Sequence, residues 1–158
     1  MKIWFDCEFI ENGRTIDLIS IGLVREDGET YYAENSECKL PKASQWVQKN
    51  VLPKLCNTHI YTKNQIAKDL VKFCGDDPEF WAYYCSYDWV VVCQLFGTMM
   101  HLPKKWPRYC NDLKQLQKML MPGHRFPKQY KNEHNALADA LWTKEAWINL
   151  ITEAQNVR

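Results

Sequence analysis

Hydrophobic and polar residues alternate along the first ten positions of the chain. One side of an extended segment would carry Ile3, Phe5, Cys7 and Phe9, and the other side Trp4, Asp6 and Glu8. This period of two predicts a strand at residues 3–10. The apolar run at residues 16–24 and the aromatic run at residues 30–33 predict two more strands. Asn12-Gly13 and Asp27-Gly28 lie between these runs and are typical of type I′ hairpins, so we expect three antiparallel strands in meander order.

The remainder of the chain has a mainly helical pattern. Thr62 with Gln65 three residues later forms a capping-box pattern that predicts a helix through residue 73, and Gly75 is placed to end it. Further helices are predicted at residues 44–51, 88–96, 112–120 and 135–154, and short strands at residues 80–85 and 109–110. For residues 88–96 a strand fits the apolar pattern equally well, and Ser86 and Asp88 as caps favour the helix. Without a repeat or a linker, we expect one mixed α/β domain over residues 1–158.

The composition excludes several classes of protein. The apolar fraction of 46% and the charged fraction of 25% are close to globular averages, which argues against disorder and against a disulfide-framed mini-protein. Seven cysteines is an odd number with no C-x-x-C pair, so we expect reduced thiols and not a zinc ribbon. No apolar run approaches the roughly 18 residues of a membrane span, and no signal peptide is recognisable. We therefore expect a cytoplasmic protein with no membrane partner.

Charge is unevenly distributed along the chain. The net charge of +1 excludes a histone-like polybasic protein, but residues 101–131 hold eight Lys or Arg against Asp112 alone. This stretch is either a solvated loop or a surface that faces phosphates, because it mixes cations with rings as single-strand channels do. The residues concerned are His101, Lys104, Lys105, Trp106, Arg108, Tyr109, His124, Arg125 and Lys128, of which Arg108 and Arg125 are our candidates for substrate binding.

Asp6 and Glu8 are the first candidates for chemistry. Two carboxylates at i and i+2 of a strand share a face about 7 Å apart, close enough to share divalent cations with a substrate phosphate. Asp-x-Glu occurs twice more in the chain, but each of those copies falls in a turn where solvated carboxylates need no explanation. The pair at Asp6 and Glu8 interrupts an apolar strand, where unpaired charges are costly. The alternative is a salt-bridged face of an edge strand.

His134, Asp139 and Asp88 complete the set of candidates. Five helical steps rotate the chain by about 140°, so His134 and Asp139 could converge only if His134 lies at or before the start of the helix. We place Asp139 in the second turn, on the side of Trp142, where an ionisable group needs a partner or an ion unless it is exposed. Asp88 is either an ordinary N-cap or a rigidly held carboxylate between the apolar strand and the helix that flank it.

Together these residues carry a family resemblance. In order and spacing they resemble the four carboxylates and the histidine of DEDDh 3′→5′ exonucleases: Asp6, Glu8, Asp88, His134 and Asp139. Over most of the chain, further runs are similar to the polyadenylate-specific 3′-exoribonuclease AS group: residues 6–10, 15–22, 46–47, 51–55, 87–88 and 93–95. DNA-proofreading members usually follow the first two carboxylates with Thr-Thr-Gly. Phe9-Ile10 stands there instead and argues against a proofreading role.

The resemblance implies a fold and an activity. The fold is ribonuclease-H-like α/β: a mixed five-stranded sheet, with strands 1–3 antiparallel and two further strands beside the first, flanked by helices. Asp6, Glu8, Asp88 and Asp139 would hold two Mg²⁺ or Mn²⁺ ions per site, with His134 as general base. The expected activity is metal-dependent hydrolysis from the 3′ end of single-stranded RNA, with adenosine-rich ends indicated by the AS group. A homodimer is also expected.

Other functions stay open at this stage. The same site would suit a single-stranded DNA 3′→5′ exonuclease, and a silent descendant could bind nucleic acid as an adaptor. The intact set of five residues argues against the adaptor, because a silent protein has no chemical reason to keep all of them. Phe9, next to the carboxylates, is either a base-stacking residue or part of the core with Ile3 and Phe5.

Overall fold

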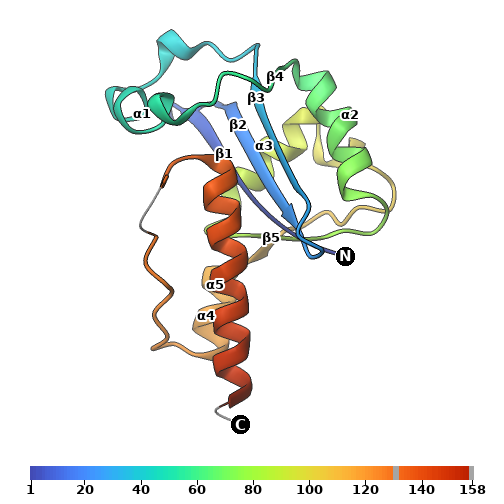
Figure 1. Cartoon of the computed structure of the whole chain (residues 1–158). Coiled ribbons are helices and arrows are strands. Elements are labelled where there is room, and N and C mark those ends of the chain that lie inside the picture. Colours follow the sequence, from blue (N-terminus) through green and yellow to red (C-terminus); the bar gives the residue numbers. More distant parts are fainter. Residues whose placement is uncertain (130–131, 157–158) are drawn as a thin grey trace.

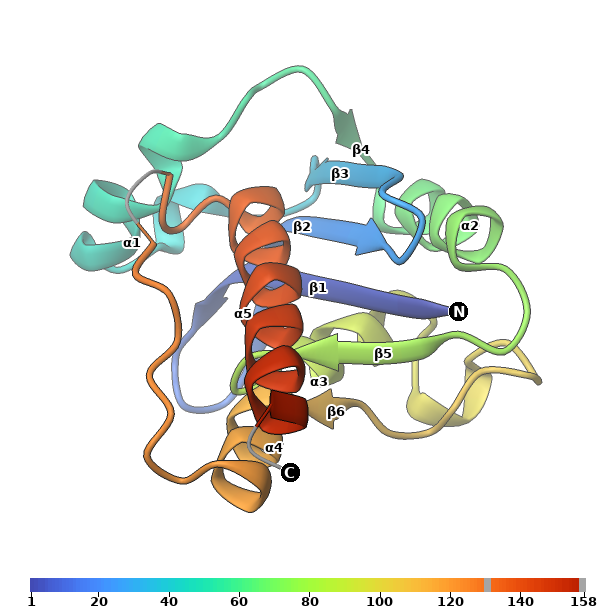
Figure 2. The ribbon, with the colours of Figure 1, turned by 60° about the horizontal axis from the view of Figure 1, so that its bottom comes forward.

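A mixed β-sheet forms the centre of the molecule in a computed structural model that describes residues 1–129 and 132–156 (Figures 1 and 2). Its strands are β1 (Lys2–Glu11), β2 (Ile16–Arg25), β3 (Thr30–Asn35), β4 (Ile60–Tyr61), β5 (Glu79–Ala82) and β6 (Asn111–Asp112), in the order β4-β3-β2-β1-β5-β6. The first three strands are antiparallel, and β5 and β6 run parallel to β1 on its other side. This confirms the predicted arrangement. The two-residue strand β4, parallel to β3, was not predicted and gives the sheet a sixth strand.

Helices cover both faces of this sheet. The α-helices are α1 (Gln45–Asn50), α2 (Lys63–Cys74), α3 (Ser86–Leu95), α4 (Leu113–Leu120) and α5 (Ala136–Asn156), and three short 3₁₀ helices are η1 (Leu40–Lys42), η2 (Leu52–Lys54) and η3 (Met99–His101). Figure 2 shows α5 crossing one face of the sheet, with α3 behind the strands. Within the described residues, no helix combines the length and the apolar character that crossing a membrane requires.

Strand β1 has a buried face on each side, as its alternation predicts. Ile3 and Phe5 are almost completely buried in the main core, which also contains Leu70 of α2 and Val92 of α3. Trp4 points the other way and contacts the ring of Trp147 of α5, with ring centroids 5.4 Å apart. Asp6 and Glu8 alternate in phase with Trp4, so the pleat directs them to the face that α5 covers.

A register shift follows directly after the second carboxylate of β1. Glu8 pairs with Ser20 of β2 and Phe9 pairs with Leu18, which leaves Ile19 as an extra residue on β2. Such bulges re-aim side chains and are common beside active sites. Here the extra residue lies on β2, and Phe9 of β1 still packs against the same main core as Ile3 and Phe5.

The two hairpin turns differ from the predicted type I′. That turn needs a positive φ at both central residues, whereas only Gly13 (φ 79°) and Gly28 (φ 97°) have one. In the first loop the Asn12 side chain accepts hydrogen bonds from the backbone N–H groups of Arg14 and Thr15. The Asn12 side chain thus stabilises a four-residue connection instead of a two-residue turn.

Side-chain caps set the starts of α1, α2 and α4, whereas α3 begins without one. Ser44 and Thr62 cap α1 and α2, and Gly75 ends α2 with a φ of 64°. The prediction that Ser86 or Asp88 caps the next helix is wrong, because α3 begins at Ser86 without a side-chain cap. Asp88 therefore lies in the first turn of α3, where its carboxylate is free for another partner.

Candidate active site

The pairing of β1 with β5 stops just before the candidate carboxylates. The last paired residues are Trp4 and Trp81, after which the chain leaves the sheet through Tyr83 and Tyr84 toward α3. Beyond this point the backbone N–H of Cys7 donates to Oδ1 of Asp88 at 2.9 Å. Asp88, with 6% of its surface exposed, thus fills the position at which β5 leaves β1. Parallel strands commonly form a ligand crevice where they diverge at their carboxyl ends.

His134 and Asp139 are brought together at the start of α5. His134 has a φ of 69° and lies before the helix, as the rotation argument predicts. Its backbone N–H donates to Oδ2 of Asp139 at 3.0 Å, and the side chain of Asn135 accepts from the N–H of Ala138 at 3.1 Å. Because α5 begins at Ala136, Asp139 lies in its first turn and not in its second.

A glycine of β2 allows this helix end to lie directly on the sheet. Gly22 pairs with Asp6, and a Cβ placed on Gly22 would lie 2.3 Å from the backbone nitrogen of Leu137. No side chain fits at that distance. Glycine within a strand can mark such a close backbone approach, and here the approach places Asp139 above the carboxylates of β1.

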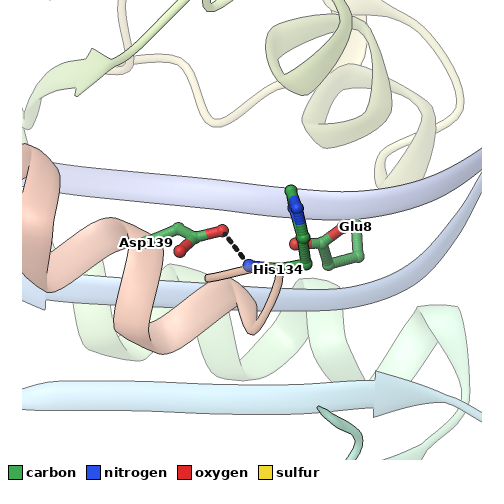
Figure 3. Close-up of side chains that lie close together, drawn as sticks. All are labelled: Glu8, His134 and Asp139. Carbon is green, nitrogen blue, oxygen red and sulfur yellow. Dashed lines mark hydrogen bonds between the residues drawn. The ribbon is translucent and has the colours of Figure 1, made fainter. Parts of the chain in front are cut away.

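Five separated residues therefore meet in one place. Ligand atoms of Glu8, His134 and Asp139 all lie within 4.8 Å of one another (Figure 3). Asp6 and Asp88 line the same pocket, which has a volume of about 470 Å³ and is also bordered by Tyr83 and Tyr87. The candidates that the sequence placed in three distant segments thus form a single cleft.

The four carboxylates disfavour one another's ionised state. Burial raises the pKa of Glu8 to about 8, and the charges of Asp139 and Asp88 add to the effect. Burial also raises the pKa of Asp88 to about 7. The pKa of Asp6 lies well above its ordinary value because of burial and then of the charges on Asp88, Glu8 and Asp139. Burial raises the pKa of Asp139 as well, opposed by its hydrogen bonds from Gln129 and His134.

Two contacts that the sequence did not indicate hold the histidine side of the cleft. Gln129 donates from Nε2 to Oδ1 of Asp139 at 2.5 Å, so both oxygens of that carboxylate are engaged. Trp46 of α1, 55% exposed, lies edge-on to the ring of His134 with centroids 4.8 Å apart. Gln129 stands in no recognisable motif, and Trp46 lies in the run 46–47 that resembles the AS group, without a role assigned to it. The sequence does carry a signal for the close approach of α5 to the sheet, because Gly22 lies in the middle of an apolar strand.

The three residues proposed for substrate binding have different surroundings. Phe9 lines the pocket and meets Tyr87 edge-on at 5.9 Å while also packing against the main core, so both of its predicted roles are compatible with its position. The guanidinium of Arg108 donates instead to the loop carbonyls of Leu102, Pro103 and Trp106. Arg125 is exposed and does not border this pocket.

The donor set suits hard divalent cations. Carboxylate oxygens are the ligands that Mg²⁺ and Mn²⁺ prefer. Ionising four carboxyl groups at one site costs free energy unless a positive charge compensates their repulsion. Within the described part of the chain, no Lys or Arg forms an ion pair with any of these four carboxylates. Burial and mutual repulsion thus raise the pKa of these carboxyls, and a bound cation would offset both effects.

Comparison with known proteins identifies the family. The sequence model of the 3′-5′ exoribonuclease Rv2179c-like domain matches residues 1–151. The chain belongs to this family. A curated relative, the 3′-5′ exoribonuclease Rv2179c of Mycobacterium tuberculosis strain H37Rv, is 42% identical over 148 residues, which cover 89% of this chain and 87% of the relative. The exoribonuclease MT2234.1 of strain CDC 1551 matches equally. The chain is therefore a 3′→5′ exoribonuclease, a hydrolase of the Rv2179c-like family.

Solved structures confirm the ribonuclease-H-like fold of this exoribonuclease. Escherichia coli exonuclease I in complex with a dT13 oligonucleotide superposes with a TM-score of 0.71 at 13% identity, covering 98% of this chain and 41% of the other. The RNase domain of the yeast Pop2 protein gives a TM-score of 0.68 at 12% identity, covering 96% and 77%. The chain thus spans about two fifths of exonuclease I, and the likeness to both structures concerns the fold alone.

Proposed function

We propose that this exoribonuclease hydrolyses single-stranded RNA from its 3′ end in a metal-dependent reaction at the cleft of Glu8, His134 and Asp139. The convergence of these ligand atoms within 4.8 Å, with Asp6 and Asp88 in the same pocket, carries the proposal. Chance surface clusters of acidic groups are usually solvated. Here the carboxylates lie on a central strand and on two helix starts that hold them in place.

Asp6, Glu8, Asp88 and Asp139 would hold two Mg²⁺ or Mn²⁺ ions. Such ions would acidify the attacking water, stabilise the leaving 3′ oxygen and offset the charge that develops at phosphorus. The hydrogen bonds from Cys7 to Asp88 and from Gln129 to Asp139 orient these two carboxylates, as outer partners of metal ligands generally do. A zinc-bound form of the E. coli exonuclease I complex with single-stranded DNA has been solved, which is consistent with a divalent-cation site on this fold.

His134 would accept the proton of the attacking water at a neutral ring nitrogen. A general base needs to reach the water that it deprotonates, and histidine is the side chain that most often has this role. The backbone bond to Asp139 fixes where the residue lies, and the ring of Trp46 restricts the imidazole from one side. The proposed base thus shares its anchor with a proposed metal ligand.

The substrate is expected to be the 3′ end of an RNA strand, with adenosine-rich ends preferred. The cleft volume of about 470 Å³ falls in the range of sites for small ligands, so we expect it to hold the terminal nucleotide. Phe9 and Tyr87, the latter 50% exposed, present ring surface on which a base could stack. The adenosine preference rests on the resemblance to the AS group.

A panel of 5′-labelled homopolymers tests the proposal. RNA and DNA 12-mers of each base are incubated with Mg²⁺, with Mn²⁺ or with EDTA, and the products are separated on a sequencing gel. We expect ladders that shorten from the 3′ end, that require the cation and that form faster on RNA than on DNA, fastest on adenylate. Asp139→Asn serves as the control for contaminating nuclease. Cleavage that is unaffected by EDTA would overturn the metal proposal, and faster cleavage of DNA would favour a DNA exonuclease.

A homodimer is the second part of the proposal. Leu141 and Ile148 lie on one side of α5 and are 44% and 47% exposed, and with Lys144 and Thr152 they border a shallow pocket beside the β2–β3 hairpin. A second copy of the chain would bury this apolar surface. Light scattering at high micromolar concentration is expected to give twice the 18.7 kDa mass of the chain, and a monomer under these conditions would refute the dimer.

A further inference from the structure

A second pocket near the cleft is lined by lysines. Lys39, Lys42 and Lys63 border it, together with Asp17 and with Ile10 of β1. The lysines come from an unusual stretch: residues 38–63 contain five lysines and no Asp or Glu. The positive charge of this stretch does not appear in the net charge of the whole chain, because the preceding strands are acidic.

Two of these lysines are available for a ligand. Lys39 and Lys42 are exposed, and within residues 1–129 and 132–156 neither forms an ion pair. Lys63 is held by Asp17 at 2.7 Å. Counting the three lysines against Asp17, the pocket has a net charge of +2 and should attract an anion.

The lysine pocket and the cleft share two structural elements. On β1, Glu8 and Phe9 line the cleft and the next residue, Ile10, lines the lysine pocket. On α3, Tyr87 lines the cleft and Gln94 lines the lysine pocket. Seven helical residues bring a side chain back to the same face about 10 Å further along, so one face of α3 borders both.

Two aromatic side chains line the cleft on the elements that it shares with the lysine pocket. Phe9 and Tyr87 contact each other there, one from β1 and one from α3. Along β1 the order is therefore the Glu8 carboxylate, then the Phe9 ring, then Ile10 at the lysine pocket. Grooves for single-stranded nucleic acid combine rings that stack on bases with cations that meet the backbone.

In the basic stretch at residues 101–131, Lys128 borders a pocket next to Asp6, His134 and Asp139, whereas several other residues of the stretch contact the protein itself. Trp106 is buried, Arg108 binds loop carbonyls and Lys105 pairs with Asp76 at 2.7 Å. The ring of His124 is buried against Glu153. The structure thus uses several of these residues to hold loops in place.

We propose that Lys39 and Lys42, in the pocket shared with Lys63, bind backbone phosphates of the RNA strand on the 5′ side of the cleaved bond. The inference rests on the proposed function and names the path of its substrate. An enzyme that removes the 3′-terminal nucleotide must leave the remaining strand on the 5′ side, beyond the acidic cleft. The lysine pocket is a cationic surface that a strand following β1 and α3 past the Phe9 and Tyr87 rings would meet.

The substrate-length dependence of Lys39→Gln/Lys42→Gln tests this path. A dinucleotide ends before the lysine pocket, whereas a 12-mer crosses it. We expect the ratio of kcat/KM on the 12-mer to that on the dinucleotide to fall about tenfold, the scale for two exposed charge contacts. The slope of log kcat/KM against log salt for the 12-mer should become shallower by about 1.4, since each single-strand phosphate contact contributes about 0.7. Lys68→Gln/Lys72→Gln removes the same charge from exposed positions of α2 and should leave the ratio unchanged.

The possible outcomes separate this inference from the function on which it rests. An unchanged length ratio in Lys39→Gln/Lys42→Gln would overturn the proposal that the RNA strand crosses the lysine pocket, and so would an equal fall in the α2 control. Either result would leave an acidic protein as the partner of the pocket. If the wild-type chain cleaves nothing, the proposed function fails. Fluorescence anisotropy of a 5′-labelled RNA 12-mer in EDTA then still tests the surface: tenfold weaker binding by the pocket variant alone supports the path, and equal binding by wild type and variant overturns it.

Discussion

Gly22 of β2 and Leu137 of α5 lie so close that the backbone of Leu137 occupies the space of a side chain on Gly22. A Cβ there would be 2.3 Å from the Leu137 nitrogen and 2.4 Å from its Cα. Both neighbours are backbone atoms and cannot move away as a flexible side chain could. The distance between α5 and β1, and with it the position of Asp139 over Asp6, therefore depends on the absence of one methyl group.

Gly22→Ala should displace the start of α5 and reduce both stability and activity. Overpacking of this kind costs about 1–3 kcal/mol of unfolding free energy, and we expect kcat to fall more than about tenfold because catalysis depends on sub-ångström placement. Thermal denaturation and single-turnover kinetics measure the two effects. Gly123→Ala is the matched control, since nothing lies within 4 Å of a Cβ at Gly123. Equal behaviour of the two variants would contradict the close-packing argument.

The metal-free protein should become less stable as the pH rises from about 4 to 8. The folded pKa values of Glu8 and Asp88, about 8 and about 7, lie above those of the unfolded chain. In this window the folded state therefore holds protons that the unfolded state has released, and stability is lost as these carboxyls ionise. In EDTA the Tm should fall across the window, and in Mg²⁺ the fall should shrink or reverse because ions bind the ionised groups.

Glu8→Gln provides the control for this pH dependence. The amide keeps the shape of the side chain without its titration, so in EDTA the variant should have a flatter Tm profile and a higher Tm near pH 8. A wild-type Tm that stays level or rises between pH 4 and 8 in EDTA would show that the cluster is not under electrostatic strain.

His134→Ala should remove activity without removing the metal response. Loss of a general base lowers kcat by about 10²–10⁴-fold, while the four carboxylates remain to bind the cation. The increase in Tm on adding Mg²⁺ should therefore persist in the variant. A lost increase would instead make His134 a metal ligand, as its distance from Glu8 and Asp139 would also allow.

Arg108→Ala should affect stability and not substrate affinity. Its guanidinium donates hydrogen bonds to three loop carbonyls. Removing this charged donor should lower the free energy of unfolding by about 2 kcal/mol. Arg125→Ala, at an exposed position, should cost less than about 0.5 kcal/mol. Denaturant unfolding and the KM for an RNA 12-mer separate the two effects. A raised KM in Arg108→Ala at unchanged stability would restore this residue to the substrate path.

The sequence predicted those parts of the site that depend on local periodicity. The alternation of β1 placed Asp6 and Glu8 on one face, and the rotation of five helical steps placed His134 outside α5. These inferences succeeded because each depends on the geometry of one element. The joint meeting of the five residues came from the family resemblance, since no local rule brings residue 8 to residue 139.

Tertiary contacts account for what the sequence did not reveal. Gln129 reaches Asp139 from a segment without helix or strand, and Trp46 reaches His134 from a helix more than 80 residues earlier in the chain. The lysine pocket has no signal in the net charge of the chain, because the acidic strands before it balance the five lysines of residues 38–63. In the stretch at residues 101–131 the sequence does not distinguish side chains that the folded loop uses internally, such as Trp106 and Arg108, from Lys128, which borders a pocket next to the cleft.

The cleft combines parts of the fold with very different resistance to local opening. Asp6 and Glu8 lie on a strand bonded to neighbours on both sides. Asp139 and His134 depend on the first turn of one helix, and the described residues 121–129 and 132–135 before it lie in no helix or strand. Helix ends and their connections open at much lower free energy than central strands. On warming, this enzyme should lose catalysis while its sheet is still intact, so that inactivation precedes melting.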